Sequence, residues 1–172
     1  MSRTFKGRAI LAGSLQGEAL VTHAGFNTYA SFYTSIHAPV EAARCADSGN
    51  RELYGKNMTG KVLCLPTTIG STSAGAVWQR VALVGVAPKA VLFSQKIDPL
   101  AAGGLVVADV WATSRGQTSG RIVTVDQLGD EFLACVKDGD RIVIRKDGEV
   151  EVKVEVEVEV EVEVEVEVEV EG

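Results

Sequence analysis

Residues that hold metals or form disulfide frameworks are scarce in this chain. Its 172 residues include three cysteines and two histidines. Cys45, Cys64 and Cys135 are odd in number and far apart, and no two of them form a CxxC pair. This pattern argues against a disulfide framework, a zinc site or an iron-sulfur motif, so we expect no metal ligands in this chain. The cysteines are expected to be reduced thiols in a cytoplasmic protein.

Long apolar runs are also absent. No segment approaches the roughly 20 apolar residues that a membrane-spanning helix requires. Near the start of the chain, Phe5–Arg8 interrupts the apolar pattern, so we expect no secretory signal peptide. These observations predict a protein that has no membrane partner.

The two signs of charge are distributed unevenly. Residues 1–148 include sixteen basic and twelve acidic residues, a net charge of +4, whereas residues 149–172 include one basic and eleven acidic residues. The overall charge of −6 therefore does not describe the body of the chain. A mildly basic body favours small acidic molecules or acidic protein surfaces. It falls short of the clustered basic stripe of a nucleic-acid-binding protein, so we expect no nucleic-acid partner.

From Glu149 to Glu171, valine alternates with glutamate, and only Lys153 interrupts the pattern. Alternation with period two is typical of a strand, but like-charged glutamates on one face oppose a strand at neutral pH. The regularity indicates an extension of a genuine final strand, Glu149–Val152, or an artificial appendage. We therefore divide the chain into a domain over residues 1–148 and a tail over 149–172 that contributes nothing to function.

The body is about the size of one domain. Short apolar runs predict buried strands, and helix-like segments lie between them. These elements are strands at 62–65, 90–94 and 121–125 and helices at 76–84 and 100–108. Asp98 and Pro99 suit the start of the second helix, although Gly103–Gly104 weakens it. The alternation predicts an α/β fold with mixed strands and two or three helices.

The other strands are predicted from turns. Residues 8–11 and 18–22, separated by a Gly-containing turn, look like a strand pair. Two Asp-Gly pairs bracket residues 141–145, which predicts a hairpin with the final strand. Residues 23–60 are less regular. We interpret them mainly as a long excursion over the surface, and such loops often carry function.

The stretch Thr67–Gly75 favours chemistry more clearly than any other part of the sequence. It follows an apolar strand that ends at Pro66, it opens a helix, and it is rich in glycine and hydroxyl side chains. A strand, a loop and a helix N-terminus aim backbone N–H groups and the positive end of a helix dipole at one place. That arrangement suits an anionic ligand.

With this loop in view, the chain resembles the swivel domain, or small subunit, of the aconitase X group of dehydratases over about residues 4–152. The resemblance rests on short motifs that are spread along the body. They are Phe5–Ile10, Gly17–Val21, Gly60–Leu63, Gly70–Gly75, Ala87–Ala90 and Asp138–Asp140. The resemblance implies a swivelling β/β/α domain, in agreement with the α/β pattern.

The resemblance also implies a partner and a cofactor. In the family, a larger part bears an iron-sulfur or iron centre and most of the substrate pocket, and in two-subunit members this part is a separate large subunit. The chain is therefore expected to bind no cofactor itself and to be inactive without that large subunit. The implied reaction is the dehydration of a small anionic hydroxy acid.

In this family the small part supplies a serine at a Gly-Ser-Thr position, which corresponds to Ser71. The resemblance therefore implies that Ser71 is catalytic, with Ser73 the less favoured claimant. It also implies that Gly70, Thr72 and Ser73 bind substrate. The residues by themselves leave a second interpretation open, in which the hydroxyl side chains of Ser71, Thr72 and Ser73 only cap the helix.

Family members differ in substrate, which is cis-3-hydroxy-L-proline in bacterial members and mevalonate 5-phosphate in archaeal ones. Archaeal members tend to have a hydrophobic residue where Ser73 stands, and the insertion at 45–53 resembles bacterial forms. We therefore expect dehydration of cis-3-hydroxy-L-proline to 1-pyrroline-2-carboxylate, with mevalonate 5-phosphate as the alternative. A non-catalytic scaffold is an alternative of another class. A phosphohistidine carrier is disfavoured because no histidine stands at the loop–helix junction.

Several other side chains have weaker claims to a functional role. His23 and His37 lie in the irregular region, where we expect them to face solvent without a catalytic function. Arg115 offers a contact for a carboxylate or phosphate, but a plain surface loop is the favoured interpretation. Trp78 and Trp111 fit either an interface with the large partner or the core.

Overall fold

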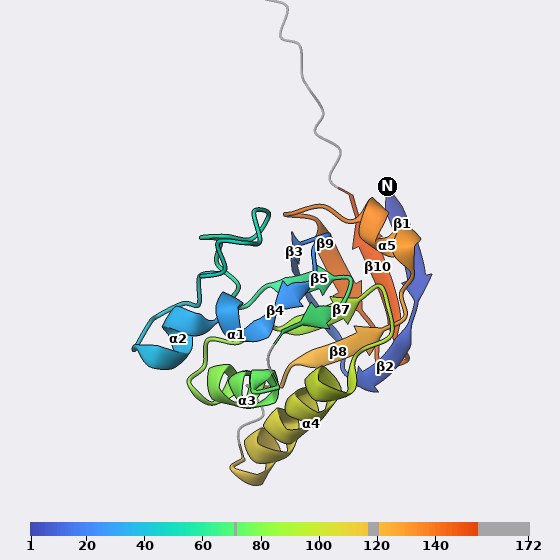
Figure 1. Ribbon diagram of the computed structural model, residues 1–172. Helices are drawn as coiled ribbons and strands as arrows, with labels where there is room; N and C mark the ends of the chain where they lie inside the picture. The colour runs from blue at the N-terminus through green and yellow to red at the C-terminus, as the bar shows by residue number, and fades with distance from the viewer. Residues whose placement is uncertain (71, 117–120, 155–172) are drawn as a thin grey trace, which may run out of the picture.

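The computed structural model describes residues 1–70, 72–116 and 121–154 (Figure 1). The strands are β1 Ser2–Lys6, β2 Arg8–Leu11, β3 Leu15–Val21, β4 Phe26–Asn27, β5 Val62–Leu65, β6 Thr68–Ile69, β7 Ala90–Phe93, β8 Val123–Asp126, β9 Arg141–Ile144 and β10 Glu149–Lys153. The helices are α1 Thr28–Ser31, α2 Tyr33–His37, α3 Ala74–Leu83, α4 Pro99–Ser114 and α5 Asp130–Cys135. Ser71, the predicted catalytic residue, lies outside the described residues.

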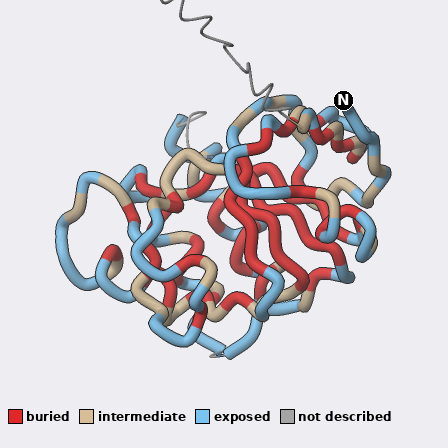
Figure 2. Tube along the Cα trace, turned by 90° about the horizontal axis from the view of Figure 1, so that it is seen from above, coloured by how far each residue is buried: buried red, intermediate tan, exposed pale blue. Residues whose placement is uncertain are grey.

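Ten strands form two sheets in the described part of the chain. The larger sheet has the order β1-β10-β9-β3-β5-β7-β8-β2, and the smaller one pairs β4 with β6. The centre of the larger sheet is parallel, from β3 through β5 and β7 to β8. Every residue of β5, β7 and β8 is buried, as expected for strands that are covered on both faces (Figure 2). The prediction of buried strands near 62–65, 90–94 and 121–125 is confirmed.

Alternate residues of the central strands belong to two separate cores, one on each face of the sheet. Leu63 and Leu65 of β5 pack with α3 and α4, whereas Val62 and Cys64 pack with α5 and the β9–β10 hairpin. The predicted hairpin is confirmed, since β9 and β10 are antiparallel neighbours. We call the side of the sheet with α3 and α4 the helical face, and the side with α5 the hairpin face. The helices α3 and α4 lie side by side in Figure 1.

The predicted pairing of residues 8–11 with 18–22 is wrong. Strand β2 pairs with β8 at the far edge of the sheet, and β3 pairs with β9 and β5. A bidentate ion pair ties β2 to β8, because Arg8 donates to the two carboxylate oxygens of Asp126 at 3.0 and 2.7 Å. Asp126 also accepts the backbone N–H of Ile97 at 2.8 Å. A run of apolar residues marks a strand but does not specify the partner of that strand.

The described residues form five helices, where two or three were predicted. The additional ones are α1, α2 and α5, which have four, five and six residues. Helices of one turn are too short to show a periodic apolar face in the sequence. None of the described helices is long and apolar enough to cross a membrane.

Most of the region 23–60 is exposed or half-buried, as expected for a surface excursion, but part of it is built into the core. Phe26, Phe32, Leu53 and Met58 are fully buried in the helical-face core. Phe26 and Phe32 both contact the ring of Trp78, with centroid distances of 6.1 and 5.6 Å. Trp78 is itself 0% exposed, which decides its role in favour of core packing.

The helices α3 and α4 approach each other very closely at two glycines. A Cβ atom at Gly104 would lie 2.4 Å from the Cα of Gly75 and 2.8 Å from its carbonyl oxygen. Gly104, one of the two glycines that weaken the predicted helix, is therefore what allows α4 to pack there. Helix α4 runs unbroken through Gly103 and Gly104 for 16 residues, beyond the predicted 100–108.

Candidate functional site

The hydroxyl-rich loop leaves the sheet at the carboxyl end of β5, in the middle of the parallel strands. Ligands of open α/β sheets bind at this edge. The loop is held there by backbone pairing, because β6 lies parallel to β4 with Phe26 opposite Thr68 and Asn27 opposite Ile69. In addition, the Phe26 N–H donates to the carbonyl of Thr67 at 2.9 Å. The start of the loop is therefore fixed by a strand from the irregular region.

A side-chain hydrogen bond joins the loop to α4. The Thr68 hydroxyl donates to Oδ2 of Asp98. Oδ1 of the same carboxylate caps α4, since it accepts the N–H groups of Leu100 at 3.0 Å and Ala101 at 2.9 Å. The predicted start of this helix at Asp98 and Pro99 is confirmed. Asp98 therefore serves two purposes, as a helix cap and as an anchor for the loop.

Position 70 requires glycine for two reasons. Its φ of +99° favours glycine, and a Cβ atom would lie 2.7 Å from the amide nitrogen of Asn27. The Asn27 Oδ1 atom accepts the N–H of Ala30 at 3.1 Å and caps α1, so this side chain is held in place. Asn27 is a site neighbour that the sequence analysis missed. The Asn-Thr pair signals a helix cap, but nothing in the sequence indicates its contact with Gly70.

The last residues of the loop lead directly into α3. Ser73 is the N-cap residue of this helix, with φ −75° and ψ −5°, and its side chain makes no capping hydrogen bond to it. Capping by the hydroxyl, the plain alternative for this residue, is therefore not what the structure shows. Gly70 and Thr72, which flank Ser71, are both exposed. The proposed substrate-binding roles of Gly70, Thr72 and Ser73 stay predictions.

Two longer helices begin beside the loop, and their N-terminal ends differ in charge. The Asp98 carboxylate offsets the positive end of α4, to which it is bonded. The first turn of α3 contains no acidic residue. Because no carboxylate of its own first turn offsets it, the positive end of the α3 dipole suits an anionic group.

His23 follows β3 and therefore also lies at the carboxyl end of a parallel strand. Its Nδ1 atom is 2.7 Å from Oε1 of Glu52, and its Nε2 atom is 3.1 Å from the carbonyl of Leu133. The Glu52 carboxylate raises the pKa of His23. Burial works to raise the pKa of Glu52, but the bonds from His23 outweigh it, and the pKa of Glu52 is lowered. Both ring nitrogens face acceptors, so the imidazolium form fits this site.

The other candidates are not brought to the loop. Arg115 is the C-cap residue of α4, at the opposite end of that helix from Asp98, about 24 Å away for a helix of 16 residues. Trp111 is 47% exposed on the last turns of α4. His37 lies in α2, where it contacts the hydroxyl of Tyr29 at 3.3 Å. Among the described residues, no three His, Cys, Asp or Glu side chains are grouped to hold a metal ion.

Comparisons with known proteins bear on both the fold and the site. A family model described as the aconitase X swivel domain matches residues 4–154. The chain is 32% identical over 148 residues to a phosphomevalonate dehydratase small subunit of Archaeoglobus fulgidus, which covers 86% of this chain and 96% of that protein. It is 28% identical over 125 residues to a cis-3-hydroxy-L-proline dehydratase of Pseudomonas aeruginosa, which covers 73% of this chain and 19% of that protein.

The fold is also similar to that of a solved structure, the holo-form of Thermococcus kodakaraensis aconitase X. The TM-score is 0.69 at 24% identity, and the match covers 87% of this chain and 98% of that chain. The predicted α/β swivel fold is confirmed by this likeness and by the mixed sheet of the larger layer.

Proposed function

We propose, since the chain belongs to the aconitase X swivel-domain family, that it is the small subunit of a hydro-lyase that dehydrates cis-3-hydroxy-L-proline to 1-pyrroline-2-carboxylate. The family match over residues 4–154 carries the assignment to an aconitase X-type subunit, and it does not select the substrate. Its relatives are named dehydratases, and at least six of them are named phosphomevalonate dehydratase small subunits. The exposed loop at the carboxyl edge of the sheet supplies a place where substrate would meet this chain.

The proposal includes a large subunit that holds the metal. The Pseudomonas aeruginosa relative matches this chain over only 19% of its own length, so that protein joins a comparable segment to a much larger remainder. The described residues here gather no metal-ligand group. An iron-sulfur or iron centre would belong to the large subunit, where it would act as a Lewis acid on the departing hydroxyl.

Within this chain, Ser71 is the proposed catalytic residue. The reaction removes a proton from the carbon beside a carboxylate, and a serine hydroxyl is a very weak acid whose alkoxide must be stabilised. A helix dipole contributes roughly 0.3–2 kcal/mol, whereas each pKa unit requires about 1.4 kcal/mol. The N-terminus of α3 therefore supplies only a small part of the free energy that is needed to stabilise the alkoxide. A dry site closed by the large subunit would supply the rest, which explains why the chain is expected to be inactive alone.

Two observations point to different substrates. Ser73, at the N-cap of α3, stands where the family resemblance places a hydrophobic residue in archaeal members, which favours hydroxyproline. The name of the Archaeoglobus fulgidus relative favours phosphomevalonate as the second candidate. A phosphorylated substrate needs additional cationic groups, and these would come from the large subunit.

The test is turnover of each substrate by this chain, by the large subunit from the same organism, and by their mixture after iron loading. We expect loss of cis-3-hydroxy-L-proline and formation of the cyclic imine in the mixture only. Turnover of mevalonate 5-phosphate instead would select the second candidate. Turnover by the large subunit alone would overturn the shared site.

The role of Ser71 is tested in the active mixture. We expect Ser71→Ala to lower kcat by at least about 100-fold, as loss of a group that acts in the transition state does. Ser73→Ala, two residues along the same loop, compares the two claimants: it should retain kcat and raise KM, since Ser73 is proposed to bind substrate. If Ser71→Ala keeps wild-type turnover and complex formation, the chain is a scaffold rather than a catalytic subunit.

A further inference from the structure

Helix α4 has an outward face that lacks the polar residues of an ordinary surface helix. Among its 16 residues Asp109 is the only charged one, and it is paired with Arg121 at 2.8 Å. A surface helix normally has charged and polar residues opposite its buried stripe, whereas a helix that is apolar all round is covered on all sides. The inner side of α4 packs on α3 and the sheet through Ala101, Leu105 and Ala108.

The outer side exposes large apolar side chains at the N-terminal end of the helix and over its second half. Leu100, Val107, Val110 and Trp111 are 47%, 44%, 60% and 47% exposed. They follow one another at spacings that keep them on neighbouring parts of the helix surface. Single exposed apolar residues are normal, but a contiguous stripe of them marks an interaction site. We call these four residues the α4 stripe.

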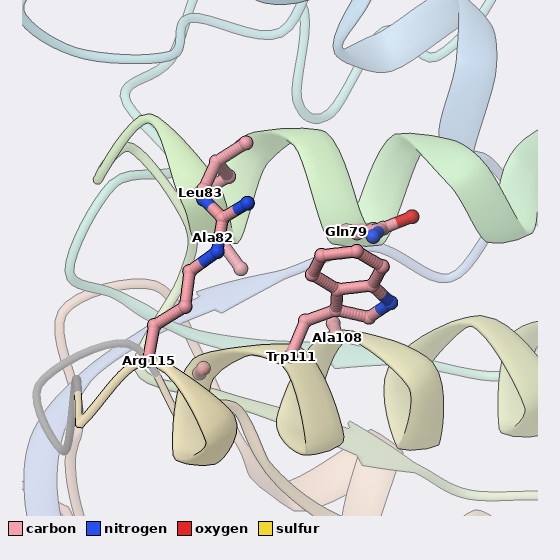
Figure 3. A pocket seen from close by; sticks show the side chains of 7 residues that line it. Gln79, Ala82, Leu83, Ala108, Trp111 and Arg115 are labelled. Atoms are coloured by element: carbon pink, nitrogen blue, oxygen red, sulfur yellow. The ribbon is translucent and has the colours of Figure 1, made fainter.

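At its C-terminal end the α4 stripe borders a groove between α3 and α4 (Figure 3). The groove encloses about 240 Å³, and Ala82, Ala108 and Ala112 leave room in it between the helices. Trp111 and Arg115 extend from α4 toward α3 beside it, as Figure 3 shows. The groove is therefore deep enough to take an apolar side chain from another protein.

Trp111 and Arg115 form one rim of this groove, and Arg115 gives it a positive charge. The Arg115 guanidinium lies 5.2 Å from the centre of the Trp111 ring. Arg115 makes no ion pair with any residue that the structure describes. Trp and Arg are the residue types that most often dominate protein interfaces. The fitting occupant is an apolar side chain next to an acidic group.

The other end of the α4 stripe reaches the hydroxyl-rich loop. Leu100 donates its N–H to Asp98, and the Asp98 carboxylate accepts the hydroxyl of Thr68 in the loop. Ile69, the next loop residue, is also 53% exposed. A protein that closes over the loop would therefore also meet Ile69 and the N-terminal end of the α4 stripe.

These observations favour one of the two proteins that could cover the α4 stripe. A second copy of this chain would bring two Arg115 side chains and no acidic partner from the α4 stripe, because a twofold interface uses the same surface twice. A large subunit that closes the loop is adjacent to the stripe by geometry. We propose that the α4 stripe and its groove dock the large subunit, through an apolar side chain in the groove and an acidic group on Arg115. This proposal rests on the proposed function.

The test is binding of the isolated large subunit, measured by calorimetry and by co-elution. Val110→Asp places a charge in the middle of the stripe, and we expect it to weaken the complex by at least about tenfold, equivalent to 1.4 kcal/mol. Tyr54→Asp is the matched control, since Tyr54 is equally exposed at 60% but lies outside the stripe. It should bind like the wild type. Trp111→Ala, which removes the aromatic anchor without adding charge, should weaken binding as well.

The two proposals fail in different ways. At saturating large subunit, Val110→Asp should regain wild-type kcat, because the residue is not in the loop. Wild-type affinity of both Val110→Asp and Trp111→Ala in an active complex would overturn the docking surface and leave the function intact. A tight wild-type complex that dehydrates neither substrate would overturn the function alone. Self-association of the chain that Val110→Asp abolishes, without any effect on the large subunit, would assign the stripe to a second copy and overturn the proposal.

Discussion

The layers that cover the hairpin face and the helical face of the sheet differ in the polarity of their outer surfaces. On the hairpin face, β10 alternates buried valines with glutamates, and its neighbours carry ion pairs such as Arg145 with Glu149 at 2.9 Å and Lys6 with Asp147 at 2.8 Å. On the helical face, α4 is apolar on both its inner and its outer side. The hairpin face is therefore complete as a surface in water, whereas the helical face is built for a further protein layer.

The two faces also differ in how closely their elements approach each other. Elements on the hairpin face pack through apolar side chains such as Phe5 and Phe132, whose ring centroids are 5.5 Å apart. On the helical face the backbones of Gly75 and Gly104 are in direct contact, one residue into the helix that leaves the loop. The position of the loop thus depends on a contact between backbones that cannot yield as a side chain can.

The largest effect is expected from Gly104→Ala. The new methyl group would overlap the backbone of Gly75, and such overpacking costs about 1–3 kcal/mol in the free energy of unfolding. Gly103→Ala is the matched control, because a Cβ atom there meets nothing within 4 Å. It should stabilise the chain by up to about 1 kcal/mol through helix propensity. Urea unfolding of both variants measures the difference.

The same pair tests whether the contact positions the loop. Gly104→Ala should also lower kcat of the mixture with the large subunit, since displacement of a reacting group by about 1 Å can cost roughly 100-fold. Equal stability of the two alanine variants would show that α3 and α4 separate without cost. The close approach would then have no influence on the site.

A smaller, pH-dependent effect is expected from the His23–Glu52 pair, which joins the end of β3 to the irregular region. Because the pKa of His23 is raised, its contribution to stability is complete below the ordinary value of 6.5 and is lost as the pH rises through the raised pKa. The pKa of Glu52 is lowered, so its contribution is present above 4.5 and is lost as the pH falls through the lowered pKa. The pair should therefore stabilise most between these values.

His23→Ala tests this window. We expect a loss below about 1 kcal/mol at pH 5.5, as for exposed ion pairs, and a smaller loss at pH 9. His37→Ala is the control, since His37 contacts the hydroxyl of Tyr29 rather than a carboxylate. Urea midpoints at the two pH values give the result. A loss for His23→Ala that is the same at both pH values would exclude the ion pair as its origin.

These comparisons show what the sequence could predict. The strands at 62–65 and 90–94 were readable because strands buried on both faces are apolar throughout. The cap at Asp98 was readable because capping is local. The full length of α4 was not, since helix propensity counts Gly104 as unfavourable and contains no information about Gly75.

The site was predictable only in part, for a similar reason. The strand, loop and helix around Thr67–Gly75 follow from local pattern, whereas the catalytic role proposed for Ser71 rests on the family resemblance. The contacts that hold the loop come from Asn27 and Asp98, which are distant in sequence. Such partners are set by the packing of β4 and α4 against the loop. No periodicity along the chain encodes them.

The ion pairs of the hairpin face should contribute little, which sharpens the contrast with the buried contacts. Arg145 bonds to both Glu149 and Glu151, at 2.9 and 3.1 Å, but its side chain is 48% exposed. Arg145→Gln should therefore lower the free energy of unfolding by about 0.2–1 kcal/mol, and less in 1 M salt. Denaturant midpoints at low and high salt measure this. A loss that persists in full at high salt would argue for packing by the arginine stem rather than for the charges.

The smallest effect is expected from removal of residues 155–172. The family match ends at residue 154, and β10 ends at Lys153 with its valines buried against β9 and β1. The hydrogen bonds that complete this edge therefore lie within the retained chain, including the Val154 N–H that donates to the carbonyl of Met1 at 3.0 Å. The shortened chain should keep the wild-type unfolding midpoint and kcat with the large subunit. The removed segment is rich in glutamate, and protonation near pH 4 ends the repulsion between the glutamates of neighbouring molecules. The shortened chain should therefore aggregate less than the full chain near pH 4. A loss of turnover would instead assign the tail to the complex, and the hairpin face would then need a partner as the helical face does.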